Sequence, residues 1–252
     1  MADTWILLRG LIREQRHWED FPGLLRRENP GKQIVTLDVA GNGTRYREPS
    51  PLTIRGMTES IRTELHQRGI KGPFHLVAIS MGAMLGLEWL VEYPGEIQSA
   101  VLMNTSLRAF NPFYDRFNPR TYPLLGKALL TPDTMARERH ILTITSNLRT
   151  DHELIARRWA GYAREHPTSR LNALRQLTAA ARYRCPRHAP HNRILILNGG
   201  KDRLVSPDCS IRLARQWLLP FRQNPEAGHD LALDAGSWSA AEASEFLEKT
   251  GR

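Results

Sequence analysis

The sequence predicts an α/β protein built on a mostly parallel, doubly wound sheet with a helical insertion. Over the first hundred residues, short apolar runs that suit buried strands alternate with amphipathic helical patterns. Strands this apolar are expected to be covered on both faces, which is typical of parallel sheets flanked by helices. The alternation is interrupted across residues 105–190 and resumes near Arg193. One α/β unit with an inserted helical segment accounts for this pattern.

The first part of the chain contains four predicted strands separated by helices. The strands are expected at residues 4–8, 33–39, 74–79 and 97–103. A helix is predicted over residues 14–27, where apolar side chains recur at helical spacing. Thr53 is placed to cap a second helix, whose apolar positions lie three and four residues apart as far as Leu65. A third helix follows Ser80 and is stopped at Pro94.

The second part of the chain begins with the insertion and then returns to the strand pattern. Within residues 105–190, helix starts are predicted at Thr131-Pro132 and at a capping box formed by Thr150 and Glu153. A strand is expected at residues 193–197, and further helices are expected to begin near Ser206 and Ser237. We therefore expect an α/β core formed by residues 1–104 and 191–252, and a helical domain formed by residues 105–190.

Length and composition limit the class of protein. A chain of 252 residues is long enough for one large α/β domain with a sizeable core. Its two cysteines, Cys185 and Cys209, do not make a disulfide framework. Residues 1–8 lack the basic start and the long apolar run of a signal peptide, and no segment approaches the length needed to span a bilayer. The expectation is a cytoplasmic protein.

The net charge of +9 is concentrated in the insertion. Residues 105–190 contain 15 Lys and Arg against 6 Asp and Glu, whereas the remaining residues contain 20 of each. Strong basicity can indicate a nucleic-acid partner, but the alternation of aromatic and basic residues found in such modules is missing here. The arginines of the insertion fit two interpretations, an attraction for an anionic partner or a solvated helical face.

The most informative stretch is "FHLVAISMGAMLG", residues 74–86. An apolar strand leads to Ser80, and an apolar helix follows with Gly82 and Gly86 on one face. A strand, a sharp turn at a serine and a helix form a nucleophile elbow, which exposes the hydroxyl and leaves the next backbone N–H free to bind an anion. The positions two before and two after the serine are small, Ala78 and Gly82. The competing interpretation is a serine that caps an ordinary buried helix.

Serine is a weak nucleophile at neutral pH, so the elbow needs a base and a group that orients that base. Functional groups of doubly wound sheets gather where strands end, so the residues that follow each predicted strand are the candidates. The strand at 193–197 is followed by "NGGKD", which ends in Asp202, and "PEAGHD" later supplies His229. The exit after Met103 offers Asn104 instead of an acid, which favours Asp202 as the orienting group.

With these landmarks the sequence resembles the α/β-hydrolase superfamily, in its capped, carboxylesterase-like serine-hydrolase branch. The resemblance covers nearly the full chain apart from the insertion. It rests on the elbow at Ser80, the turn ending in Asp202, the "AGHD" containing His229, the exit Arg9-Gly10-Leu11 and the glycine turn after Asp38. The chain begins at what would be the third strand of the family, which implies a sheet of about six strands.

The resemblance implies a catalytic triad and an acyl-enzyme mechanism. Ser80 would attack an acyl carbon, His229 would take and return the proton, and Asp202 would hold the imidazole in the correct tautomer. The backbone N–H groups of Leu11 and Met81 would bind the oxyanion, and neither a metal nor an organic cofactor is required. The insertion would be the helical cap that selects the substrate.

Three interpretations of the function follow. A carboxylic ester with a small or medium acyl group is the first. The second is a thioester or ester carried by CoA or an acyl carrier protein, which the basic insertion favours. The third is a fold retained as a non-catalytic binding module for an anionic partner. The aromatic side chains of the insertion either line an acyl pocket or pack its small core: Phe110, Phe113, Tyr114, Phe117, Tyr122, Trp159 and Tyr162.

Two further features have competing interpretations. Arg9 stands where the family usually has histidine, and it is either paired with a nearby carboxylate or a fixed positive charge that binds an anionic substrate. Cys185, His188 and His191 are spaced by three residues, as in some zinc sites. No fourth ligand lies nearby, and Pro186 and Pro190 favour an ordinary connecting loop.

Overall fold

The computed structural model describes residues 4–190 and 193–250. Its centre is one six-stranded sheet with the order β2-β1-β3-β4-β5-β6, in which every pair of neighbours is parallel. The strands are β1 (Thr4–Leu8), β2 (Gln33–Leu37), β3 (Phe74–Ile79), β4 (Ile97–Met103), β5 (Ile194–Gly199) and β6 (Phe221–Asn224). Because the order reverses between β1 and β3, a crevice is expected at the carboxyl ends of these two strands.

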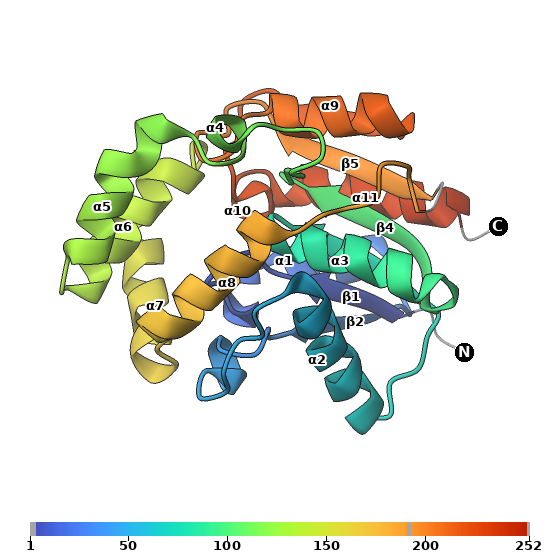
Figure 1. The fold of residues 1–252 in the computed structure, drawn as a ribbon, viewed down its shortest axis with the longest axis horizontal. Coiled ribbons are helices and arrows are strands. Elements are labelled where there is room, and N and C mark those ends of the chain that lie inside the picture. The colour runs from blue at the N-terminus through green and yellow to red at the C-terminus, as the bar shows by residue number, and fades with distance from the viewer. Residues whose placement is uncertain (1–3, 191–192, 251–252) are drawn as a thin grey trace.

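Helices cover both faces of the sheet (Figure 1). One face packs against α2 (Ile54–Gln67), α3 (Met81–Glu92) and α9 (Asp208–Trp217), and the other packs against α1 (Phe21–Glu28) and α11 (Gly236–Thr250). Side chains of a strand point alternately to the two faces. In β1, Ile6 and Leu8 accordingly belong to the first layer and Trp5 and Leu7 to the second. The predicted parallel, doubly wound sheet is therefore confirmed.

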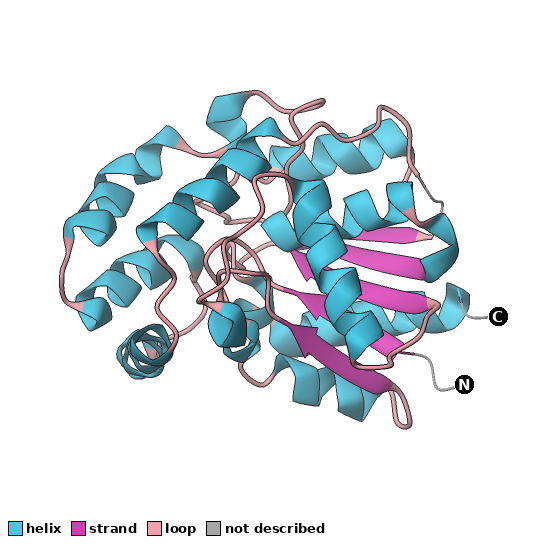
Figure 2. Cartoon of the chain, turned by 60° about the horizontal axis from the view of Figure 1, so that its bottom comes forward, coloured by secondary structure: helices cyan, strands magenta, loops and turns pink. Residues whose placement is uncertain are grey.

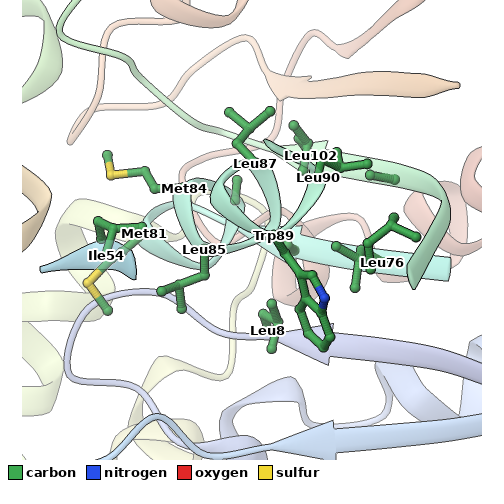
Figure 3. Packing of buried hydrophobic residues seen from close by; sticks show 14 of the residues in the cluster. Leu8, Ile54, Leu76, Met81, Met84, Leu85, Leu87, Trp89, Leu90 and Leu102 are labelled. Carbon is green, nitrogen blue, oxygen red and sulfur yellow. The ribbon is translucent and has the colours of Figure 1, made fainter. Parts of the chain in front are cut away.

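Helix α3 follows the candidate elbow and is apolar on nearly every side. Its side chains contact Leu8, Leu76 and Leu102 of three neighbouring strands (Figure 3). The indole of Trp89 is completely buried and packs edge-on against Phe74. This packing fixes the helix on the sheet, and with it the turn at its start.

The insertion is helical throughout its regular structure and lies beside the carboxyl ends of the strands (Figure 2). Its helices are α4 (Phe113–Arg116), α5 (Tyr122–Leu130), α6 (Thr134–Thr145), α7 (His152–Glu165) and α8 (Arg170–Arg182). A small apolar cluster joins Leu142 of α6 and Trp159 of α7 to Leu233 of α10 (Leu231–Asp234). The insertion thus packs on the segment that follows His229.

Three local predictions need correction. The helix expected over residues 14–27 is two elements, η1 (Gln15–Trp18) and α1, because Pro22 cannot donate the helical hydrogen bond to residue 18. Helix α6 begins at Thr134, two residues after the predicted Pro132, because the Asp133 carboxylate accepts hydrogen bonds from the amides of residues 135 and 136.

The cap of α7 also differs from the prediction, since Asp151 precedes that helix and no capping bond from its side chain is present. The predicted cap of α2 is confirmed, because Thr53 accepts a hydrogen bond from the Gly56 amide.

Three short 3-10 turns complete the regular structure of the described chain: η2 (Gly43–Arg45), η3 (Pro94–Glu96) and η4 (Pro119–Thr121). None of the helices in residues 4–190 and 193–250 is long and apolar enough to cross a bilayer.

Candidate active site

Ser80 lies in a strained turn between β3 and α3. Its backbone angles are φ 58° and ψ −121°, and its amide donates to the Met103 carbonyl of the neighbouring strand. A side chain at position 82 would place its Cβ 2.3 Å from the carbonyl oxygen of Leu8, so only glycine fits there. The packed helix and the close approach of β1 hold this positive φ, which a non-glycine residue rarely adopts.

The structure brings Ser80, His229 and Asp202 into one line of hydrogen bonds. His229 Nε2 lies 3.1 Å from Ser80 Oγ, and His229 Nδ1 lies 2.7 Å from Asp202 Oδ2. The other oxygen of Asp202 accepts from the amides of Leu204 and Val205, both at 2.9 Å. The carboxylate is thereby fixed so that one oxygen faces the imidazole.

The imidazole of His229 is buried, and nearby charged side chains shift its pKa. Burial by itself lowers the pKa of His229, but the Asp202 carboxylate offsets this through its charge and its hydrogen bond. The charge of Asp230 raises the pKa of His229 further, and the charge of Arg9 lowers it. The net result is a pKa above the ordinary value of 6.5. The buried ring therefore binds a proton more readily than a free imidazole does.

The two candidate oxyanion donors lie on either side of Ser80. Met81 is the first residue of α3, where amides have no partner within the helix. Leu11 follows Gly10, at which an added Cβ would lie 3.0 Å from the Cβ of Ser80, so the turn after β1 runs directly past the nucleophile. Among the described residues, neither amide donates a hydrogen bond to another group of the protein.

Comparison with known proteins shows the family to which the sequence belongs. Residues 5–242 match the model of the Alpha/beta hydrolase family. The chain belongs to this family.

The individual relatives of this chain are distant. It is 27% identical over 107 residues to a probable lysophospholipase, BODYGUARD 2, of Arabidopsis thaliana, covering 40% of this chain and 22% of the relative. It is 39% identical over 67 residues to a homoserine O-acetyltransferase of Pelobacter propionicus, covering 26% and 18%. The chain thus aligns with about a fifth of each relative's length. A thermophilic esterase from Thermogutta terrifontis shares the fold, with a TM-score of 0.73, 17% identity, and coverage of 100% of this chain and 92% of the esterase.

Arg9 is paired with a carboxylate, which is the first of its two interpretations. Its Nη1 and Nη2 donate to the two oxygens of Asp230 at 3.0 and 2.6 Å, and both side chains are buried. The guanidinium also lies over the ring of Trp18, 4.9 Å from its centroid. Both Nη groups that could bind a substrate carboxylate are therefore already hydrogen-bonded to Asp230.

Asn104 has a role that the sequence did not reveal. Its Nδ2 donates to the carbonyls of Gly228 and His229, at 3.0 and 2.7 Å, and its Oδ1 accepts from the Gly199 amide. The residue itself has φ 46°, which Asn tolerates better than most residues. Asn104 thus holds the main chain that carries the imidazole. The position of Asn104 at a strand exit was the signal that could have revealed this role. For Asp230, the signal for a partner of Arg9 was its position next to His229.

The remaining candidates of the insertion are dispersed. Cys185 is buried and His188 exposed, His191 lies outside the described residues, and within the described chain no group of three metal-binding side chains occurs. Of the aromatic residues, Trp159 is completely buried in the insertion's own cluster, whereas Phe113 and Tyr114 are more than 60% exposed.

Proposed function

We propose that this protein is a serine hydrolase that cleaves a carboxylic ester through an acyl-enzyme, with Ser80, His229 and Asp202 as its catalytic triad. The observation that carries the proposal is the continuous relay from Asp202 through both nitrogens of His229 to the hydroxyl of Ser80. A serine paired with a base, which is itself oriented by a third group, is the arrangement that activates such a nucleophile.

The chemistry follows from the positions of these atoms. Ser80 Oγ attacks the acyl carbon while its proton passes to His229 Nε2, and the imidazolium returns that proton to the departing alcohol. Water then attacks the acyl-serine with the same imidazole as general base, which releases the acid and restores the serine. Asp202 holds the proton on Nδ1, so that Nε2 is free to act as the base.

The negative oxygen that forms during each attack would be bound by the amides of Leu11 and Met81. Within residues 4–190 and 193–250 neither amide donates to another group, and both belong to segments that run next to Ser80. One such donor is typically worth about 3 kcal/mol of transition-state stabilisation. Because proline is the only substitution that removes a backbone N–H, and it also fixes φ, the contribution of these amides is better tested through the residues that hold them.

Residues 105–190 would act as the cap of the α/β core formed by residues 1–104 and 191–252. The insertion lies at the carboxyl edge of the sheet (Figure 2). Ser80 follows the last residue of β3 at this edge, and His229 is hydrogen-bonded to it. A relative named as a lysophospholipase and a structural neighbour named as an esterase are consistent with an oxygen ester as substrate. We expect the cap to set the acyl chain that is accepted.

A second candidate is a thioesterase, or an esterase that acts on acyl groups carried by CoA or acyl carrier protein. The excess of positive charge in the cap favours it, and several of the arginines are exposed, including Arg157 and Arg164. Within the described residues, no ion pair of these two side chains is present, whereas Arg139 is paired with Glu153. Free guanidinium groups would attract a phosphorylated or acidic carrier.

Turnover of a p-nitrophenyl ester and of an acyl-CoA by the wild type and by Ser80→Ala tests the proposal and separates the candidates. The ester hydrolase predicts the higher kcat/KM on the simple ester and little response to salt. The thioesterase predicts the reverse preference, with kcat/KM for acyl-CoA falling as salt screens the cap. Equal activity of Ser80→Ala and wild type would disprove Ser80 as the nucleophile. No turnover of either substrate, together with no labelling of Ser80 by a fluorophosphonate, would leave the non-catalytic binding module.

A further inference from the structure

The turn after β1 contains a residue in an unfavourable backbone conformation next to the candidate oxyanion donor. Ile12, which follows Leu11, has φ 59°. A β-branched residue in this region is a genuine outlier, because its side chain crowds the main chain. Such a conformation persists only where the surrounding structure holds it. The contacts that hold Ile12 therefore also determine where the neighbouring Leu11 amide points.

The contact at Ile12 comes from the cap. Gln176 of α8 is completely buried, and its Oε1 accepts a hydrogen bond of 2.9 Å from the Ile12 amide. Its Nε2 donates to Asn42 Oδ1 at 2.8 Å and to Ser50 Oγ at 3.1 Å. The amide group of Gln176 is thus fixed at both ends, which gives it one orientation toward Ile12.

Helix α8 is well placed to transmit this constraint. It runs from the end of α7 toward the sheet (Figure 1), and its later residues Ala179 and Tyr183 belong to the apolar layer that contains α3. Its buried side chains near Ile12 are polar, and they bond to the turns that follow β1 and β2. The helix is therefore anchored to the core on both sides of Gln176.

We infer that Gln176 is a positioning residue for the oxyanion hole: by accepting the Ile12 N–H, this side chain of the cap keeps the Leu11 amide directed toward the carbonyl that Ser80 attacks. This inference rests on the proposed acyl-enzyme function and adds to it a residue that lies far from the triad in sequence. It gives the cap a part in catalysis itself, in addition to substrate selection. Without the acceptor, Ile12 loses the hydrogen bond that compensates for its strained backbone, and the turn relaxes.

The same helix provides a matched control. Asn172, one turn before Gln176, is also buried, and its Oδ1 accepts from the Ser50 amide while its Nδ2 donates to the Glu48 carbonyl, both at 2.9 Å. It anchors α8 to the same part of the core, but in the described part of the chain its hydrogen bonds go to Ser50, Glu48 and Ser169 and not to the turn after β1. Loss of Asn172 therefore loosens the helix without removing the acceptor of Ile12.

The test compares Gln176→Met, Gln176→Glu and Asn172→Leu in the full-length protein. Methionine keeps the length of the side chain without the acceptor, whereas glutamate keeps an oxygen for the Ile12 amide. The readouts are the rate at which a fluorophosphonate labels Ser80, the kcat and KM of a p-nitrophenyl ester, and Tm. Labelling depends on the oxyanion hole, because the phosphoryl oxygen occupies it as bonds form at Ser80.

We expect Gln176→Met to lower both kcat and the labelling rate by about 30-fold, a part of the loss seen when an oxyanion donor is removed. KM should change less than about twofold, because substrate binding is unaffected. Gln176→Glu should recover part of the rate, because its carboxylate accepts from the Ile12 amide but cannot donate to Asn42 and Ser50. Asn172→Leu should retain kcat and a labelling rate within about threefold of wild type, even if its Tm falls as much as that of Gln176→Met.

A wild-type labelling rate in Gln176→Met, or an equal loss in Asn172→Leu, would overturn the inference. If wild-type Ser80 is labelled but no ester is hydrolysed, the proposed substrate class is wrong while the labelling rates still decide the role of Gln176. If wild-type Ser80 is not labelled, both proposals are wrong.

Discussion

Arg9 and Asp230 form a buried, bidentate ion pair that joins the turn after β1 to the loop that carries His229. The two residues lie 221 positions apart in the sequence. One neighbours the segment with the candidate oxyanion donor, and the other neighbours the candidate base. The pair therefore fixes the distance between two parts of the proposed site that belong to different elements, and it does so with charges that are shielded from water.

Removal of one partner of this pair is expected to destabilise the fold strongly. Arg9→Met leaves the Asp230 carboxylate buried without its cation, and such a change typically costs about 3–5 kcal/mol. The double variant Arg9→Met with Asp230→Asn should lose less, because no buried charge remains unpaired. Urea unfolding measures both. A loss below about 1 kcal/mol in Arg9→Met would show that the pair contributes little to folding.

The pair also predicts a shift in the pH profile of hydrolysis. His229 acts as a base only when neutral, and its pKa is raised above 6.5, so kcat/KM should fall with decreasing pH from a midpoint above that value. Asp230→Asn removes a carboxylate that raises this pKa and leaves the opposing charge of Arg9 unpaired. Both effects move the midpoint to lower pH. A midpoint that stays in place or rises in this variant would contradict the electrostatic explanation.

Gly82 predicts a sharp difference between two glycine-to-alanine substitutions. In Gly82→Ala the new methyl group would meet the Leu8 carbonyl at 2.3 Å, so the elbow has to shift, and we expect a loss of about 3 kcal/mol and of nearly all activity. Gly161 of α7 has no heavy atom within 4 Å of an added Cβ. Gly161→Ala should therefore gain about 0.5–1 kcal/mol from helix propensity. Thermal unfolding and ester turnover of the two variants would test this, and equal stabilities would refute it.

His17 predicts a second pH effect, on stability. Burial holds the pKa of His17 well below 6.5, and the nearby charges of Arg13 and Arg9 act in the same direction. Because the unfolded chain binds the proton more readily, stability should fall as pH drops below about 6.5, by up to about 1.4 kcal/mol per pH unit. His17→Gln should show a weaker dependence between pH 7.5 and 5.5 in urea unfolding. Identical slopes would mean that another group governs acid unfolding.

Much of the fold was predictable because its signals are local. Strands β1, β3 and β4 are apolar runs bounded by turn residues, and their predicted bounds agree with the structure. The edge strand β6, with the sequence "FRQN", was not located because its side chains are half-buried or exposed and give no apolar pattern. The helix starts of the insertion differ from the predictions because Asp133 caps α6 and because the start of α7 has no side-chain cap.

The candidate site likewise contains residues that the sequence could predict and residues that it could not. Ser80, Asp202 and His229 each follow a recognisable local pattern, and the structure brings all three together. The supporting contacts carry no such pattern, because Asn104 meets the His229 loop across 125 residues and Gln176 meets Ile12 across 164. Only the folded chain reveals which buried polar groups become partners.

The proposed acyl-enzyme can be tested most directly by peptide mapping of protein that is acid-quenched during turnover of a p-nitrophenyl ester. The triad predicts an acyl group on the peptide that contains Ser80, with neither adduct nor turnover in Ser80→Ala. Turnover at the wild-type rate in Ser80→Ala, or an adduct on another residue that is formed and broken at the rate of hydrolysis, would contradict it.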